Sequence, residues 1–167
     1  MEKLWSPWRS KYIETFKSEQ NSSKCIFCQM KDLNPNDLDN LLVDKGQHTF
    51  TVLNLYPYNN GHLMIIPFKH TAEITELDRN ESAEVFEKIK LAKLALDNVL
   101  NPHGFNLGAN LGRVSGAGVE EHVHFHIVPR WNGDTNFMPV IGEVKIISQD
   151  LLDTKNNLIK FYHNLNK

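Results

Sequence analysis

Residues 122–128 read His-Val-His-Phe-His-Ile-Val, and from His122 to Ile127 histidine and apolar side chains alternate strictly. Strict alternation predicts a β-strand, because successive side chains of a strand point to opposite faces. His122, His124 and His126 would therefore share one face, and the apolar residues between them would pack on a core. Imidazoles that follow one another at intervals of about 7 Å along a strand are costly to bury without partners. The pattern therefore indicates a function.

Two chemical uses fit three imidazoles on one face. Neutral imidazole is a nucleophile near pH 7, and the phosphoramidate that it forms can pass its phosphoryl or nucleotidyl group on. Neighbouring histidines can hold the tautomer of that nucleophile, donate to a phosphate oxygen or protonate the leaving group. The second use is metal binding, because alternate strand residues also bind zinc. A chance cluster of surface histidines is the third interpretation that the spacing leaves open.

A glycine-rich loop, residues 110–118 (NLGRVSGAG), precedes the histidine segment. Small residues leave backbone N–H groups accessible, and such a loop can hold phosphate oxygens. Alone, the loop could equally be a flexible connection. Next to three histidines it favours nucleotide chemistry.

Short strands are expected on both sides of a long helical stretch. Residues 49–53 (TFTVL) and 62–67 (HLMIIP) flank a turn rich in Pro, Asn and Gly, which predicts a hairpin. Residues 105–110 predict a further strand, and residues 144–147 another. Strands gathered around one helix favour the α+β class with a mainly antiparallel sheet.

One long helix is predicted between Asp78 and Asn101. Asp78 and Glu81 match a capping pair, and Asn101-Pro102 stops the helix. The apolar residues expected along it recur at spacings of three and four, and they are Val85, Phe86, Ile89, Ala92, Leu96, Val99 and Leu100. A C-terminal helix is expected from Ser148 toward Leu165.

Size and charge narrow the class of protein. The 167 residues, 41% hydrophobic and 23% charged, predict a single globular domain, with residues 1–40 as an arm carrying a cysteine pair and residues 41–167 as its core. A net charge of −2 provides no basic field for nucleic acid. The sequence contains no apolar run of about 18 residues, so no membrane span is predicted. Residues 1–10 lack the apolar region of a secretory signal, so a cytoplasmic location is expected.

The chain resembles the histidine-triad (HIT) family. His-x-His-x-His followed by two apolar residues is the signature of that family, and residues 122–128 match it fully. The resemblance extends through LWSPWRSKYI (4–13), CIFC (25–28), NLYPYNNGHLMIIP (54–67) and residues 110–140. It points to the bacterial branch that contains diadenosine tetraphosphate phosphorylases and hydrolases. It implies an α+β fold with a mainly antiparallel sheet of about five strands, one long central helix and a C-terminal helix.

The resemblance also implies roles for individual residues. His124, the middle histidine of the triad, would be the nucleophile, and His126 would contact phosphate near the scissile bond. His62 matches an upstream histidine that assists the triad. Asn54 stands eight residues before it, where the family has a ribose-binding Asn or Asp.

The glycine-rich loop matches the segment that contacts phosphate in the family. Asn110, Gly116, Ala117 and Gly118 are the matching residues. Some members of the family carry Gln or Ser where this chain has Ala117 and Gly118. Because those side-chain donors are missing here, the acceptor of the reaction, phosphate or water, stays open.

Cys25 and Cys28 have the spacing of half a zinc site. From the residues alone, a redox pair or two thiols packed in a core remain alternatives. The resemblance implies a closed, structural zinc held by Cys25, Cys28, His70 and His122. That set of ligands would leave the other two histidines of the triad free for chemistry.

The function expected is the splitting of an adenine dinucleoside polyphosphate, such as diadenosine tetraphosphate, through a nucleotidyl group bound to His124. Phosphate or water would then release the nucleotide. The alternatives are hydrolysis of nucleoside phosphoramidates or acyl-adenylates by the same intermediate, and a non-catalytic nucleotide-binding module. Uridylyl transfer to sugar phosphates is disfavoured, since relatives with that activity have Gln in place of His126. The resemblance also implies a homodimer.

Overall fold

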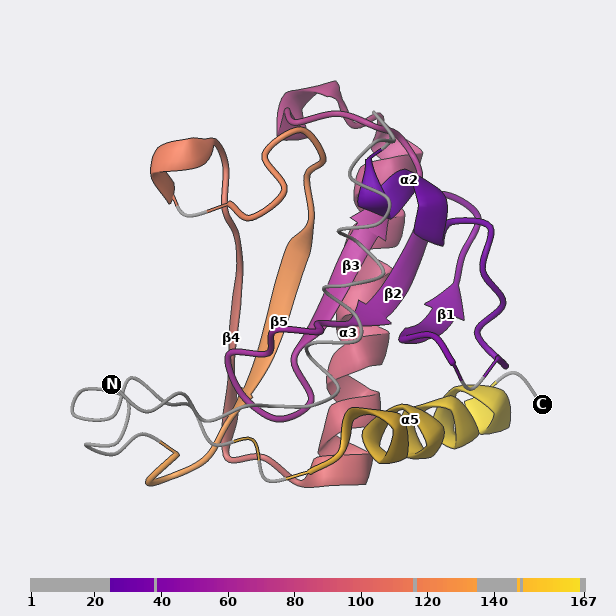
Figure 1. Cartoon of the computed structure of the whole chain (residues 1–167), viewed down its shortest axis with the longest axis vertical. Helices are drawn as coiled ribbons and strands as arrows, with labels where there is room; N and C mark the ends of the chain where they lie inside the picture. Colours follow the sequence, from indigo (N-terminus) through magenta and orange to yellow (C-terminus); the bar gives the residue numbers. More distant parts are fainter. Residues whose placement is uncertain (1–24, 38, 116, 135–146, 148, 166–167) are drawn as a thin grey trace.

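The computed structural model describes residues 25–37, 39–115, 117–134, 147 and 149–165. Within them, an antiparallel sheet with the strand order β1-β2-β3-β5-β4 forms the centre (Figure 1). Its strands are β1 (Leu42–Lys45), β2 (Thr49–Leu53), β3 (Leu63–Pro67), β4 (Gly104–Ala109) and β5 (Phe125–Arg130). The helices are α2 (Ile26–Met30), α3 (Arg79–Leu100) and α5 (Leu151–Leu165), with short 3-10 turns η1 (Ile74–Glu76) and η2 (Arg113–Ser115).

The fold agrees with the expected α+β class and its five-stranded sheet, although one strand differs from expectation. The hairpin of β2 and β3 is confirmed, with Thr49 opposite Pro67 and Leu53 opposite Leu63. β1 was not predicted. Two of its four residues are charged, and the burial of the first two arises from contacts with distant parts of the chain. Residues 144–146 of the other expected strand lie outside the described residues, and Ile147 belongs to no strand.

Both ends of α3 confirm the prediction from the sequence. The Asp78 side chain accepts from the backbone N–H of Glu81, and the Glu81 side chain accepts from that of Asp78. Asn101 ends the helix in the left-handed conformation, with φ 46°. Phe86, one of the apolar residues of the predicted periodicity, is 64% exposed. It follows the buried Val85 by one residue and so points about 100° further around the helix.

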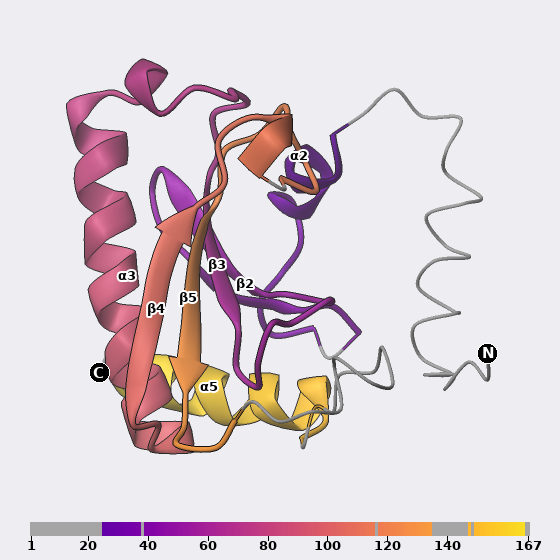
Figure 2. The ribbon, with the colours of Figure 1, turned by 90° about the vertical axis from the view of Figure 1, so that its left-hand side faces the viewer.

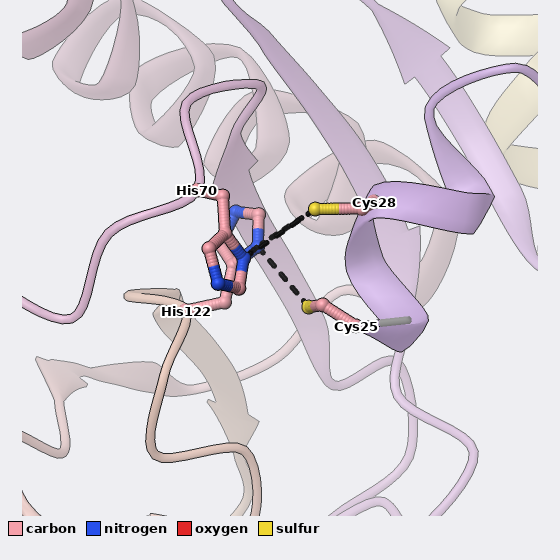
Figure 3. Close-up of side chains that lie close together, drawn as sticks. All are labelled: Cys25, Cys28, His70 and His122. Atoms are coloured by element: carbon pink, nitrogen blue, oxygen red, sulfur yellow. Dashed lines mark hydrogen bonds between the residues drawn. The ribbon is translucent and has the colours of Figure 1, made fainter. Parts of the chain in front are cut away.

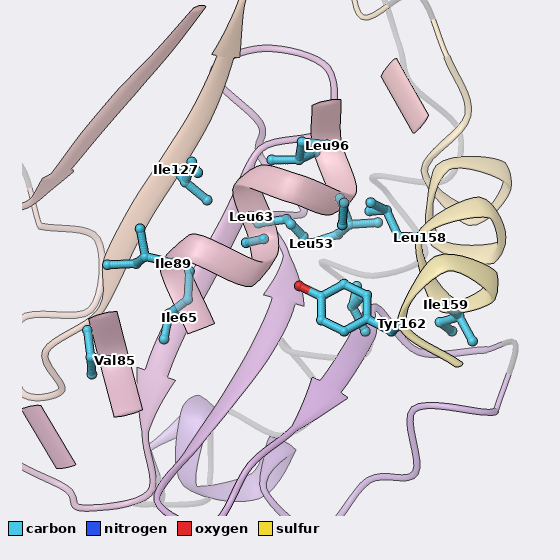
Figure 4. Packing of buried hydrophobic residues seen from close by; sticks show 13 residues of the cluster. Leu53, Leu63, Ile65, Val85, Ile89, Leu96, Ile127, Leu158, Ile159 and Tyr162 are labelled. Atoms are coloured by element: carbon cyan, nitrogen blue, oxygen red, sulfur yellow. The ribbon is translucent and has the colours of Figure 1, made fainter. Parts of the chain in front are cut away.

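α3 and α2 lie on opposite faces of the sheet, and α5 crosses below its lower end (Figure 2). α3 packs on β2, β3 and β5, and α5 packs on α3 and β1. The main core lies between them and the sheet (Figure 4), and its members include Leu53, Leu63, Ile65, Ile89, Leu96, Ile127 and Leu158. A second cluster under α2 contains Phe27, Leu42, Phe50, Val52, Met64 and Ile66. Met64 pairs with His126, which places that histidine on the α2 face.

Two further expectations concern parts of the chain outside the described residues. The arm formed by residues 1–40 is described only from Cys25 onward, so the division into arm and core stays a prediction. Ser148, the expected cap of the C-terminal helix, also lies outside, although α5 itself is confirmed. In the described part of the chain, no helix has the length and apolar character needed to cross a membrane.

Candidate active site and metal centre

The histidine segment is a strand only in its second half. β5 begins at Phe125, so the expectation of a strand from His122 onward was wrong at its start. The Val123 N–H donates to the Thr71 carbonyl over 2.7 Å, which ties this stretch to the chain that follows β3. All three histidines are nevertheless buried, with exposed fractions between 1% and 7%. The three histidines are therefore covered by other parts of the fold. They do not form a cluster on the surface.

His124 is held as a neutral ring with a free lone pair on Nε2. Its Nδ1 lies 2.9 Å from the His122 carbonyl. A carbonyl only accepts, so Nδ1 carries the proton and Nε2 does not. Burial lowers the pKa of His124, although the hydrogen bond to the His122 carbonyl partly opposes the shift. The ring is thus in the form that a nucleophile requires.

A chain of hydrogen bonds fixes the tautomers of His62 and His126. The backbone N–H of Tyr58 donates to His62 Nδ1 over 3.0 Å, so the proton of a neutral His62 sits on Nε2. His62 Nε2 lies 2.9 Å from His126 Nδ1 and donates to it. The proton of His126 is therefore on its own Nε2.

His126 Nε2 is a buried donor to which the described residues offer no acceptor. Burial, with a smaller effect of His124, lowers the pKa of His126 to about 4, so the ring stays neutral. The rings of His124 and His126 are adjacent, with centroids 4.9 Å apart. The ring with the Nε2 lone pair and the ring with the unsatisfied N–H group are thus neighbours. Unpaired buried donors are rare, and a ligand oxygen would satisfy this one.

Two of the residues expected to bind nucleotide, Asn54 and Asn110, lie next to the segments that carry these histidines. Asn54 follows β2, and its Nδ2 lies 3.3 Å from His62 Nδ1. Asn110 directly follows β4, where Ala109 pairs with Phe125 at the start of β5. Ala117 and Gly118 lie in the loop that follows η2, whereas Gly116 lies outside the described residues. A Cβ atom on Gly118 would meet nothing within 4 Å, so crowding does not exclude a side chain there.

A pocket of about 230 Å³ opens on the same face of the sheet. Cross-strand pairs connect it to the triad, because Leu42 is opposite Val52, Val52 opposite Met64 and Met64 opposite His126. The pocket therefore begins two strands away from His126. Its mostly apolar lining consists of Met30, Leu33, Asp39, Asn40, Leu41, Leu42 and Val52.

The four residues expected to bind metal come together, as Figure 3 shows. One donor atom from each of Cys25, Cys28, His70 and His122 lies within 4.8 Å of the others. His122 Nδ1 is 3.3 Å from Cys25 Sγ, 3.8 Å from Cys28 Sγ and 3.3 Å from His70 Nδ1. His122 Nε2 donates to the Pro67 carbonyl over 2.9 Å, which leaves the Nδ1 lone pair facing the cluster. The cluster can hold a metal ion.

Two aromatic residues of the site were missed in the sequence. The Phe27 ring lies 5.5 Å from that of His122 and 5.0 Å from that of His124, between centroids. The ring centroid of Tyr58 lies 4.7 Å from that of His62. Phe27 is one of the residues between the two cysteines, and Tyr58 belongs to the turn before His62. Position next to a motif was the only available signal, since neither ring has a local reason to face a histidine.

A polar network that was also missed supports the turn before His62. Asn59 Nδ2 donates to the Asp134 carboxylate over 2.7 Å and to the Pro129 carbonyl over 3.1 Å. Arg130 donates to the same carboxylate through Nε and Nη2. The turn that carries the Tyr58 N–H group is thus tied to the end of β5.

Comparison with known proteins agrees with this geometry. Residues 36–133 match the family model described as HIT domain. The chain is 42% identical over 163 residues to a Mycobacterium tuberculosis protein named AP-4-A phosphorylase, with 95% of this chain and 83% of that protein covered. It is 30% identical over 108 residues to an adenosine 5'-monophosphoramidase of Schizosaccharomyces pombe, with coverage of 65% and 75%.

A solved structure confirms the fold. The crystal structure of a Zn-bound histidine triad family protein from Mycobacterium smegmatis matches with a TM-score of 0.68 at 23% identity, over 86% of this chain and 96% of that one. Both curated relatives carry enzyme names, which confirms the expectation of an enzyme. The family model covers more than half of the chain, and the 42% identity extends along nearly all of it. The chain belongs to the histidine-triad (HIT) family.

Proposed function

We propose that the protein splits diadenosine tetraphosphate, or a closely related adenine dinucleoside polyphosphate, through a nucleotidyl group carried on His124. The observation that carries this proposal is that the ring of His124, with its Nε2 lone pair, is adjacent to the ring of His126, whose buried Nε2–H has no acceptor among the described residues. The identity to a protein named AP-4-A phosphorylase supports the substrate class.

In the first step, His124 Nε2 attacks the α-phosphorus. A P–N bond forms while the bond between that phosphorus and its bridging oxygen breaks, and ATP leaves. The imidazole gains positive charge when it bonds to phosphorus, and the His122 carbonyl on Nδ1–H stabilises that charge. His126 Nε2–H donates to a phosphate oxygen beside the breaking bond, where negative charge develops. His62 holds His126 in the tautomer that makes this possible.

The remaining parts of the site fit the rest of a nucleotide. The pocket between α2, β1 and β2 offers an apolar lining with a few polar groups, which suits an adenine base. Asn54 stands two residues after Val52 of the pocket lining and beside His62, and it is proposed to bind the ribose. Asn110 and the backbone N–H groups of Ala117 and Gly118 are proposed to contact phosphate.

Phosphorolysis is the expected second step, with phosphate attacking the nucleotidyl group to give ADP. The loop can offer N–H groups to an anion, but Ala117 and Gly118 provide no side-chain donor. A missing hydrogen bond to a charged group weakens binding by about ten- to a hundred-fold, so the KM for phosphate should be high. Diadenosine tetraphosphate supplied with labelled phosphate should give labelled ADP and unlabelled ATP. If only unlabelled AMP and ATP form at every phosphate concentration, the enzyme is a hydrolase.

Turnover and binding measured with two different substrates separate the other candidate functions. The identity to an adenosine 5'-monophosphoramidase supports hydrolysis of phosphoramidates as the second candidate. A kcat/KM for adenosine 5'-monophosphoramidate far above that for diadenosine tetraphosphate would favour it. Tight binding of both compounds without turnover of either would indicate a binding module, and would contradict the proposal.

We propose zinc as the metal of the cysteine–histidine cluster. Tetrahedral zinc with thiolate and imidazole ligands separates neighbouring ligand atoms by about 3.3–3.8 Å. The separations between His122 Nδ1 and the other three ligand atoms, 3.3 to 3.8 Å, fit this geometry. When bound, the ion would join the start of α2 to the chain after β3 and to His122. Four protein ligands make it structural rather than catalytic.

Protein purified without chelator should contain about one zinc per chain. Cys25→Ser should lower Tm more than it lowers the affinity for AMP, because none of the four cluster residues lines the pocket, whereas the ion would hold three segments together. A chelator should lower the Tm of the natural protein and leave that of Cys25→Ser unchanged, which controls for other effects of chelation. Metal-free protein in which both thiols titrate freely would contradict the assignment.

We also propose a homodimer. β4 is an edge strand, and Leu107 on it is 54% exposed. On α3, Phe86 and Leu94 are 64% and 54% exposed, and Lys93 of the same helix lies 5.2 Å above the ring of Phe105 in β4. Light scattering should therefore give twice the chain mass of 19.2 kDa, and a monomer mass would contradict the proposal. The cytoplasmic location stays a prediction.

A further inference from the structure

Lys155 of α5 is a charged residue with no exposed surface. Its Nζ donates to the backbone carbonyls of Asp37 and Asn40 and, over 3.2 Å, to Asn40 Oδ1. An ammonium group has three protons, and here three oxygens accept them. Burial lowers the pKa of Lys155, while the carboxylates of Asp37 and Asp39 oppose the shift. A buried charge is costly unless its protons find acceptors, so filling of the core does not explain this residue.

The contacts of Lys155 converge on the connection between α2 and β1. Asn40 Oδ1 also accepts from the Leu42 N–H group over 2.8 Å, and Asn40 Nδ2 donates to the Asn34 carbonyl over 2.9 Å. One amide side chain therefore joins the two ends of this connection. Lys155 in turn fixes that amide and the Asn40 carbonyl to a helix.

Most described residues of this connection before Asn40 are exposed. Leu33 is 38% exposed, and Asp37 and Asp39 are exposed as well. Segments with few buried contacts depend on their hydrogen bonds and open easily when these are lost. Asp39, Asn40 and Leu41 of the same segment form part of the wall of the pocket. Lys155 thus binds directly to a segment that lines the pocket.

We propose that Lys155 is a positioning residue for the nucleoside end of the substrate, which acts by fixing the wall formed by residues 39–41. The inference rests on the proposed function. α5 packs on α3 and β1 and contributes to the core under α3, whereas His126 lies on the α2 face of the sheet. Loss of the ammonium group should therefore weaken the binding of the nucleoside and leave the chemistry at His124 intact.

The test compares Lys155→Met with Leu158→Ala, a matched control one turn further along α5. Leu158 is also fully buried, but in the core under α3. Calorimetry gives the Kd of AMP, and steady-state kinetics give kcat and KM for diadenosine tetraphosphate, both well below the Tm of each variant. Lys155→Met should raise Kd and KM about tenfold and change kcat by less than about threefold. Leu158→Ala should lower Tm without raising Kd or KM.

Conservative variants keep the test informative. Lys155→Arg, which retains a cation and its donors, should recover most of the affinity lost in Lys155→Met. Should Lys155→Met fail to fold, Lys155→Gln takes its place, with an amide that can still donate to Asn40. Unchanged Kd and KM in the folded variants, or an equal rise in Leu158→Ala, would overturn the inference.

Failure of the proposed function has a different signature. If the natural protein binds AMP but splits no dinucleoside polyphosphate, the proposed reaction is wrong. The Kd of AMP in the Lys155 variants then still decides the inference. If the natural protein binds no adenine nucleotide at all, the pocket is not a nucleoside site and both proposals are wrong.

Discussion

His124→Ala is expected to lower kcat for diadenosine tetraphosphate about 10⁴-fold or more, because the variant lacks the proposed acceptor of the nucleotidyl group. The buried, neutral ring with its Nε2 lone pair motivates this expectation. The Kd of AMP should change little, because the pocket two strands away is not altered. Steady-state assays and calorimetry on the same preparation measure both quantities.

A matched control for this variant is His163→Ala, which removes an exposed imidazole from the last turn of α5. It should retain the activity of the natural protein. If His124→Ala retained more than about a tenth of the natural kcat, covalent catalysis by His124 would be ruled out. A large loss of Tm in the variant would instead assign the effect to folding.

His126→Ala is expected to lower kcat by about 10²–10³-fold, the usual effect of removing one donor to an oxygen that gains charge in the transition state. The unsatisfied Nε2–H group beside the nucleophile is the structural reason. His126→Gln retains an amide N–H donor and should recover part of the loss. KM should change less than kcat in both variants, because the donor acts mainly in the transition state.

The tautomers assigned to His124 and His126 can be measured directly, which tests the role of His126 a second time. Nitrogen NMR of the imidazoles should show the proton of His126 on Nε2 and that of His124 on Nδ1. A His126→Ala enzyme with kcat within about threefold of the natural value would contradict the assigned role. A proton of His126 found on Nδ1 would contradict the chain of hydrogen bonds through His62.

Elements with local causes could be predicted from the sequence. α3 begins and ends as predicted, because the Asp78–Glu81 capping box and the left-handed Asn101 are properties of neighbouring residues. The hairpin of β2 and β3 also depends on local turn chemistry. β1 could not be predicted, since burial in the folded chain stabilises four residues of which two are charged. The late start of β5 depends on a hydrogen bond from Val123 to the distant Thr71.

The candidate site shows the same division. The resemblance was enough to name the cysteine and histidine cluster, whose atoms the fold brings together from three segments. The orientation of each ring depends on distant backbone atoms, such as the Tyr58 N–H group and the Pro67 carbonyl, and no spacing indicates them. Lys155 appears in the sequence as one more polar residue of a helix. Only the packing of α5 shows that it is buried and which carbonyls it contacts.

The most direct test of the central claim is to find the nucleotidyl group on the enzyme. Protein mixed with diadenosine tetraphosphate in the absence of phosphate, quenched at alkaline pH during turnover and measured by mass spectrometry should carry one adenylyl group. Fragmentation should place it on the peptide that contains His124, and His124→Ala should carry none. An enzyme that turns over rapidly without any adduct at the earliest times, or with the adduct on another residue, would contradict the account.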